Sequence, residues 1–279
     1  MSGVNIKKQS YLNDNSFNSN HLHVKIHGKD INYVIINTLR RTLLADIPCY
    51  AFNPDNINIS KNTSVFNNDY MRNRLENIPI PKVSNDLDLS QYDKIRKFTR
   101  GRKSYETDED DGENFDNLDL LNFYVEKTND KDIIISITSD DCEFYKKGKK
   151  IKSIYSNPIL ICKLKPKEEI KISAVVDKGI GLNHSRYSPV SICCYDQLNE
   201  NEFIFKFENR GQFDDLDLLD RCCRILIFRL NSLKDKLSNQ KFSKEEHGKI
   251  ILENEDHTIG NLLSRSLQDH KNIEFAAYM

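Results

Sequence analysis

The sequence predicts an α+β fold in which a strand followed by an amphipathic helix occurs near each end of the chain. Residues 23–43 and 247–267 align without a gap and share eight identical residues in 21 positions. Between these copies, short alternating apolar segments favour strands, and one long leucine-rich segment favours a helix. A unit present twice predicts two halves that pair about a pseudo-twofold axis.

The first copy begins with a half-buried strand in which Leu22, Val24 and Ile26 alternate with polar residues. Asp30 is the expected N-cap of the helix that follows, and the helix should end near Asp46, because the residue before Pro48 is pushed toward an extended conformation. The apolar side chains of this helix recur at spacings of three and four, as expected for one buried stripe: Ile31, Val34, Ile35, Leu39 and Leu43.

The second copy repeats this strand and helix, with Thr258 as the expected cap and the helix running to Asp269. Its matching face consists of Ile259, Leu262, Leu263, Ser266 and Leu267. A lone strand and helix cannot bury such a stripe, so we expect the two stripes to share one core.

The segment between the copies reads as β-rich, with strands expected at 133–137, 158–163 and 169–176. Residues 178–181 predict a tight turn that returns the chain to the first domain; the segment lacks the ending of a phosphate-binding loop. Four parts are expected. A mobile tail spans 1–19, and a discontinuous dimerisation domain consists of 20–52 and 186–240. An inserted β-rich domain spans 53–185, and a second dimerisation half spans 247–279.

A long helix is expected after Gly211, and its apolar residues follow a heptad register. This pattern is typical of a helix that packs along another helix, although the helix could instead cover its own sheet. The register consists of Leu216, Leu219, Cys223, Leu226, Leu230, Leu233 and Leu237.

Charge and cysteine content narrow the functional classes. The formal net charge is −1, so the whole chain carries no basic footprint for nucleic acid. The acidic run at 106–113 is interpreted as a solvated loop, and the basic stretch at 94–103 leaves a local nucleic-acid or acidic-partner contact open. The seven cysteines contain no CxxC pair, and His21, His23 and His27 have no visible partner ligand, so no metal site is expected.

The sequence offers no catalytic constellation and no apolar run long enough to span a membrane. It is better suited to presenting surfaces than to chemistry. A free-standing DNA-binding transcription regulator and a thiol-redox enzyme remain alternatives. Salt-dependent DNA binding by the isolated chain would favour the first, and dithiol turnover the second.

Four blocks of the sequence carry a family resemblance. Residues 36–48 (INTLRRTLLADIP) resemble the N-terminal motif of the bacterial α subunit and of the third-largest subunit of eukaryotic RNA polymerase II. Residues 252–263 resemble the opening of its small partner, the eleventh subunit, while residues 67–80 and 178–190 resemble two further blocks of the larger subunit. The chain is similar to a fusion of both subunits, as in large nucleocytoplasmic DNA viruses, with a second half that stops early at Met279.

The resemblance implies an α-subunit-like dimerisation domain, with a mixed sheet and long helices, plus the inserted β-rich domain and a partial second dimerisation half. The implied function is a non-catalytic assembly platform of a multisubunit DNA-directed RNA polymerase. Its partners would be the two large catalytic subunits and small polymerase subunits, with DNA contacted only through the complex and no membrane, cofactor or metal. The location would be intracellular, in the virion or host cytoplasm if the protein is viral, or alternatively in the nucleus.

Two groups of residues are expected to carry this function. Arg40 and Arg41 lie about 100° apart on the helix, so both cannot lie within the apolar stripe, and we expect them to dock a large polymerase subunit. The interface between the two halves is expected to comprise Ile35, Leu39, Leu43, Leu219, Cys223, Leu226, Leu230, Leu233, Ile259, Leu263 and Leu267.

Overall fold

The computed structural model describes residues 4–9, 21–81, 89–101, 121–238, 249–252 and 255–279. In chain order its helices and strands are β1 (Asn5–Gln9), β2 (His21–His27), α1 (Tyr33–Ala45), β3 (Cys49–Asn62), α2 (Asn68–Glu76), α3 (Leu89–Gly101), β4 (Leu121–Thr128), β5 (Ile135–Thr138), β6 (Glu143–Lys146), β7 (Lys149–Ile151), β8 (Leu160–Leu164), β9 (Glu169–Gly179), β10 (Val190–Asn199), β11 (Glu202–Asn209), α4 (Asp215–Ser238) and α5 (His257–Gln268). Short 3₁₀ turns lie at Ser139–Asp141 and Ser185–Tyr187. The predicted α+β class is confirmed.

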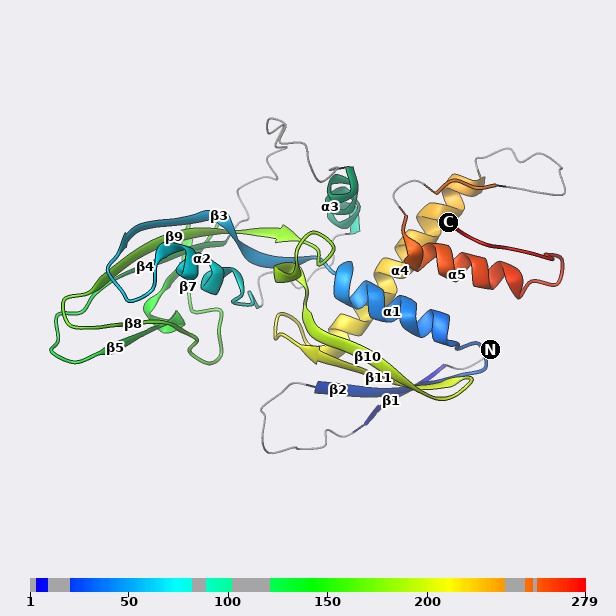
Figure 1. Cartoon of the computed structure of the whole chain (residues 1–279), viewed down its shortest axis with the longest axis horizontal. Helices are drawn as coiled ribbons and strands as arrows, with labels where there is room; N and C mark the ends of the chain where they lie inside the picture. The colour runs from blue at the N-terminus through cyan, green and yellow to red at the C-terminus, as the bar shows by residue number, and fades with distance from the viewer. Residues whose placement is uncertain (1–3, 10–20, 82–88, 102–120, 239–248, 253–254) are drawn as a thin grey trace.

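The elements are arranged around two hydrophobic cores (Figure 1). The first core lies under an antiparallel sheet of order β1-β2-β11-β10, which α1 covers, with α4 and α5 packed on the other side of α1. The second core lies between a sheet of order β3-β9-β4-β6-β7, the two-stranded sheet β5-β8, and α2. Among the described helices, none is both long and apolar enough to cross a membrane.

The first core begins with two strands whose apolar residues face one another. β2 and β11 pair antiparallel in a register that places each aliphatic residue of β2 opposite a phenylalanine of β11. All six side chains are buried, and each contributes roughly 1.5–3 kcal/mol of hydrophobic free energy. The pairs are Leu22 with Phe207, Val24 with Phe205, and Ile26 with Phe203.

The two copies of the repeat begin their helices at equivalent positions. The N-cap of α1 is Asn32, whose side chain accepts hydrogen bonds from the backbone N–H groups of Val34 and Ile35, so the expected cap Asp30 is wrong. The N-cap of α5 is Asp256, which accepts from the N–H of Thr258, so Thr258 as the cap is also wrong. Asn32 and Asp256 occupy matching places in the repeat, which the two predicted caps did not.

Three other expectations are corrected by the structure. Residues 5–9 form an edge strand paired with β2, although residues 1–19 were expected to be a mobile tail; an isolated polar strand gives little periodic signal. No strand is assigned at residues 249–252, the described part of the expected second strand. Two helices, α2 and α3, lie within the segment expected to be β-rich. Two further predictions are not tested, because the acidic run 106–113 and residues 102–103 of the basic stretch lie outside the described residues.

The long helix α4 forms as expected, but its buried face is shifted from the heptad register. Leu226 and Leu233 are buried, whereas Leu216 is 61% exposed and Cys223 is also exposed. The residues that the helix buries are Leu218, Arg221, Cys222, Ile225, Leu226, Arg229 and Leu233. This row includes two arginines, which a search for apolar residues alone passes over.

The segment 178–181 returns the chain from the second core to the first, as expected. The backbone N–H of Leu182 donates to the carbonyl of Ala45 at 2.8 Å, so the return segment lies against the end of α1. A Cβ at Gly181 would lie 2.1 Å from the carbonyl oxygen of Leu44, so only glycine permits this approach. The glycine is therefore accounted for by packing, without a bound phosphate.

Candidate functional site

A cluster of buried charges lies where the first core meets the second copy of the repeat. We call it the junction cluster, and it consists of Asp46, Arg96, Arg229, Glu255 and Asp256. These residues come from the end of α1, from α3, from α4 and from the start of α5. The cluster therefore joins segments that are distant in the sequence.

Local structure fixes the direction of each member. Asp46 is the C-cap of α1, and its backbone N–H donates to the Thr42 carbonyl at 2.9 Å. Asp256 is the N-cap of α5, where a carboxylate is favoured by the positive end of the helix dipole. Arg229 lies on the buried row of α4, one turn from Leu226 and Leu233, so its guanidinium is held against the core.

Arg229 contacts three carboxylates. Its Nη1 lies 3.0 Å from Asp46 Oδ2, while its Nη2 lies 2.6 Å from Glu255 Oε2 and 3.4 Å from Asp256 Oδ1. Arg96 adds a two-pronged contact to Glu255, with Nη1–Oε1 at 3.2 Å and Nη2–Oε2 at 3.1 Å. Its Nε also lies 3.4 Å from Asp46 Oδ1, so the two arginines share both carboxylates.

The cluster is largely removed from water. The side chains of Arg229 and Asp46 are each 2% exposed, and that of Arg96 is 7% exposed. Burial by itself would lower the pKa of Arg229, but the charges of Asp46, Tyr92 and Glu255 raise it above its ordinary value. Burial and Asp46 raise the pKa of Tyr92, whose neutral hydroxyl donates to Asp46 Oδ1 at 3.3 Å.

Buried ion pairs of this kind add little net stability but are costly to break. Desolvation of the charges offsets most of their attraction, whereas removal of one partner leaves an uncompensated buried charge and costs about 3–5 kcal/mol. A placement of α1, α3, α4 and α5 that separated these charges would therefore carry this cost.

A second contact joins the two copies of the repeat directly. Arg41 Nε donates to Thr258 Oγ1 at 2.9 Å, across 217 residues of sequence. Thr258 and Ile259 are both buried, and Leu263 packs beside them against the first core. Figure 1 shows α1 lying between the four-stranded sheet and α5, so the first turn of α5 rests on α1.

The structure brings most of the expected interface residues to this region. Leu43, Leu226, Leu233 and Ile259 are buried in the first core, and the expected residues that are partly buried against the same core are Ile35, Leu39, Leu219, Leu230 and Leu263. Two expected residues lie apart from it, because Cys223 is exposed and Leu267 is 43% exposed.

The two arginines of α1 differ in their surroundings. Arg41 is engaged with Thr258, so it acts between the two halves of this chain. Arg40 is half-buried, and its Nε donates to Asn37 Oδ1 at 3.0 Å within the same helix. Sequence reasoning missed the five residues of the junction cluster. The feature that could have indicated the cluster is Arg229, a charged residue on the otherwise apolar row of α4.

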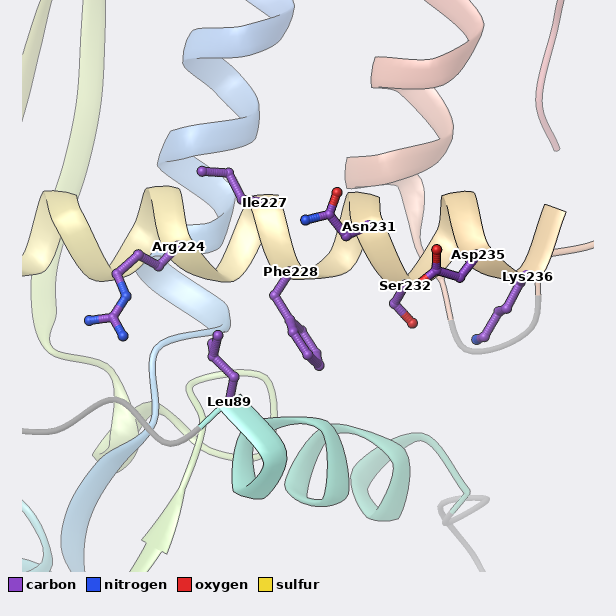
Figure 2. A pocket seen from close by; sticks show the side chains of 8 residues that line it. All are labelled: Leu89, Arg224, Ile227, Phe228, Asn231, Ser232, Asp235 and Lys236. Carbon is purple, nitrogen blue, oxygen red and sulfur yellow. The ribbon is translucent and has the colours of Figure 1, made fainter. Parts of the chain in front are cut away.

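A groove of about 680 Å³ lies beside the junction cluster, between α3 and α4 (Figure 2). Leu89 and Phe228 project toward one another across it, and the Phe228 ring lies 6.2 Å from that of Tyr92. Its other lining side chains include Arg224, Asp235 and Lys236. The charges are mixed, which is typical of a surface hollow and does not indicate a reaction centre.

Burial holds six of the thiols in their protonated form. Burial raises the pKa of Cys193 and of Cys142 to about 12 and that of Cys162 to about 11, and it also raises those of Cys49, Cys222 and Cys223. A redox-active cysteine needs the opposite shift, so these six do not support the thiol-redox alternative. Among the described residues, no group of three His, Cys, Asp or Glu side chains could hold a metal ion.

Comparison with known proteins identifies the class to which this architecture is similar. Residues 247–279, which contain Glu255, Asp256 and α5, match the family described as the RNA polymerase Rpb3/Rpb11 dimerisation domain. The segment held by the junction cluster is thus similar to this dimerisation domain.

The similarity extends over most of the chain. The chain is 28% identical to a protein of Acanthamoeba polyphaga mimivirus named as a DNA directed RNA polymerase subunit, over 92% of this chain and 77% of that protein. It is 26% identical to subunit 3 of the DNA-directed RNA polymerases II, IV and V of Arabidopsis thaliana, over 71% of this chain and 60% of that protein. The chain is 27% identical to subunit Rpo3 of the DNA-directed RNA polymerase of Methanobrevibacter smithii, over 70% of this chain and 60% of that protein. The resemblance to RNA polymerase subunits is confirmed.

Proposed function

We propose that this protein is a non-catalytic assembly subunit of a multisubunit DNA-directed RNA polymerase. Its two copies of the repeat pair within one chain through α1 and α5, and the paired unit docks the two large catalytic subunits together with small polymerase subunits. DNA is then contacted through the complex, in the virion or cytoplasm of an infected cell or in the nucleus. The observation that carries the proposal is the junction cluster, which clamps the dimerisation-domain segment onto the first core.

The docking face is proposed to include Arg40. Arg41 already donates to Thr258, while the Nε of Arg40 donates to Asn37 within the same helix. A half-buried guanidinium near the surface of α1 is suited to a planar contact with a partner carboxylate. Arg40 is therefore the better test residue of the two.

The test is co-expression of the tagged chain with the two largest polymerase subunits encoded by the same genome. The unmodified chain should recover both subunits, and Arg40→Ala should recover less of them while it keeps its own melting temperature. Arg224→Ala, on the exposed face of α4, serves as the matched control. Recovery of neither subunit by the unmodified chain would refute the assembly role.

A free-standing transcription regulator remains the alternative. It would bind one duplex sequence far more tightly than others, with an affinity for its specific site about 10³–10⁷-fold higher than for non-specific sites. Selection of a preferred duplex from a random pool by the isolated chain, together with failure to recover large subunits, would favour this alternative.

A further inference from the structure

A pair of strands carries the chain from one hydrophobic core to the other. β3 and β9 pair antiparallel, and Figure 1 shows them running together between the two cores. On β3 the change of core falls between Ala51 and Phe52, and on β9 it falls after Val176. We call the elements around the second core, residues 52–81 and 121–176, the second-core domain.

This crossing contains an irregular stretch of backbone. Regular pairing stops at Phe52 and resumes at Ile57, and the four residues between them, 53–56, lie opposite a single residue of β9, Val175. A bulge of this kind takes its residues out of the hydrogen-bonded ladder and bends the strand. Pro54 lies within it and has no backbone N–H to donate. The strand pair can therefore bend at this point.

The contacts that brace the crossing are polar. Asp177 accepts hydrogen bonds from Asn53 Nδ2 at 3.1 Å and from Tyr187 Oη at 2.7 Å. Arg186 Nη1 lies 3.5 Å from Asn53 Oδ1. Two domains that meet through polar contacts are expected to move relative to one another, whereas a large apolar interface would fix them. The angle between the two cores therefore depends on individual polar contacts.

Two arginines hold the C-terminal end of α2, a helix of the second-core domain. Arg186 Nη1 lies 3.2 Å from Glu76 Oε2, and the two side chains are only 13% and 12% exposed. Arg210, which directly follows β11, donates from Nη2 to the carbonyl of Asn77, the C-cap of α2, at 3.0 Å. A cation is favoured there, because the C-terminus is the negative end of the helix dipole. We call the contact of Arg186 and Arg210 with the end of α2 the arginine latch.

The latch is fixed on the side of the first core and less firmly held on the side of α2. Arg210 Nη1 donates to the carbonyls of Ser185 and Ser188 at 3.1 and 3.3 Å, and the neighbouring Tyr187 is buried in the first core. By contrast, the Nε of Arg186 is buried and makes no hydrogen bond with the described residues. Part of the cost of removing this guanidinium from water is therefore not recovered, which favours opening of its contact with α2.

We propose that the arginine latch sets the angle between the two cores, and that the second-core domain swings about residues 53–56 when the latch opens. Each core stays folded during this motion, because its apolar residues pack within it. A change of angle moves every face of the second-core domain relative to α1 and α4. This motion belongs to the free chain, so it goes beyond the assembly role and does not depend on it.

The test measures the distance between the two domains of the full chain by double electron–electron resonance. Spin labels are attached to p-acetylphenylalanine, which replaces the exposed Lys131 in the second-core domain and the exposed Lys234 on α4, so the native cysteines are kept. The unmodified latch should give one narrow distance distribution. Glu76→Arg places a third cation beside the two arginines and should make this distribution about twofold wider.

Three controls separate the latch from other effects of the substitution. Asp69→Arg makes the same charge change at the other end of α2, where the side chain is 89% exposed, and should leave the distribution unchanged. Combining Glu76→Arg with Arg186→Glu restores opposite charges across the contact and should recover most of the narrow distribution. A label pair at Lys131 and Lys149 lies within the second-core domain, and its distance should stay the same in every variant.

An unchanged distribution in Glu76→Arg would overturn the proposal, as would an equal change in Asp69→Arg or a broad distribution with the latch intact. If the pair within the second-core domain also widens, Glu76→Gln takes the place of Glu76→Arg, because it removes the charge without adding a cation. Glu76→Gln should widen only the distribution between the domains, and no change there would equally refute the latch. Because the free chain is measured, neither result depends on recovery of the large subunits.

Discussion

Arg229 and Asp46 are separated by 183 residues in the sequence, yet their side chains meet at 3.0 Å and each is only 2% exposed. The contact joins the middle of α4 to the end of α1 at the point where α5 begins. Because Arg229 also reaches Glu255 and Asp256, one guanidinium holds both copies of the repeat together.

Replacement of Arg229 should therefore destabilise the whole first core. Arg229→Met keeps most of the apolar length of the side chain but leaves Asp46, Glu255 and Asp256 without their shared cation. We expect a loss of about 3–5 kcal/mol in the free energy of unfolding, measured by urea titration. Arg224→Met is the control on the same helix, since its side chain is 49% exposed, and it should change stability by about 0.5 kcal/mol or less. Equal effects of the two substitutions would contradict the role of the cluster.

The hydrogen bond between Arg41 and Thr258 should appear as an energetic coupling between the copies. In a double-mutant cycle of Arg41→Met and Thr258→Val, we expect a coupling of about 0.5–1.5 kcal/mol, because each single change breaks the same bond. The cycle of Arg40→Met with Thr258→Val should give a coupling near zero. A coupling for Arg40 as large as that for Arg41 would refute the assignment.

Gly260 should be intolerant of a side chain because of Tyr278. A Cβ at Gly260 would lie 2.7 Å from Cδ2 of that ring, so Gly260→Val should displace residues 274–279 from α5 at a cost of about 1–3 kcal/mol. Hydrogen exchange should then increase in α5, and the thermal unfolding temperature should fall. Adding Tyr278→Ala to Gly260→Val removes the clash and should restore part of the loss; absence of any rescue would show that the strain lies elsewhere.

The raised thiol pKa values predict slow and pH-dependent alkylation. With a pKa of about 12, Cys193 is about 10⁻⁴ thiolate at pH 8, and its reaction with N-ethylmaleimide should accelerate about tenfold for each unit of pH. The exposed Cys194 beside it provides the internal comparison and should react first. Peptide mass spectrometry after timed labelling measures both rates. Equal rates in the folded protein would contradict the buried position of Cys193, and equal rates are expected only in urea.

The periodic parts of the fold could be predicted from the sequence, whereas the site depends on contacts that periodicity does not encode. Alternation in β2 identified the buried residues Leu22, Val24 and Ile26 correctly, because a strand shows its inner face every second position. The predicted heptad register missed the true buried row of α4 because Arg229 and Arg221 belong to it. The position of Arg229 among apolar residues of α4 hints at burial, but the local sequence does not show its carboxylate partners, since these lie on other elements.

The caps show a similar limit. Asp30 and Asn32 are both good capping residues, and only the backbone geometry decides between them. The α3 helix was missed for another reason: Tyr92 and Ile95 lie in the expected inserted domain, yet they pack into the first core.

The pairing of β2 with β11 also sets the order in which the chain can fold during synthesis. Leu22 cannot meet Phe207 until about 185 further residues have been made, whereas β3, β4 and β9 belong to a core that closes within residues 52–176. We therefore expect the second core to fold first while the chain is being made, with β2 and α1 waiting as exposed apolar segments. The apolar residues of β2 and α1 then stay without their partners until β11 and α4 have been made and Arg229 can meet Asp46.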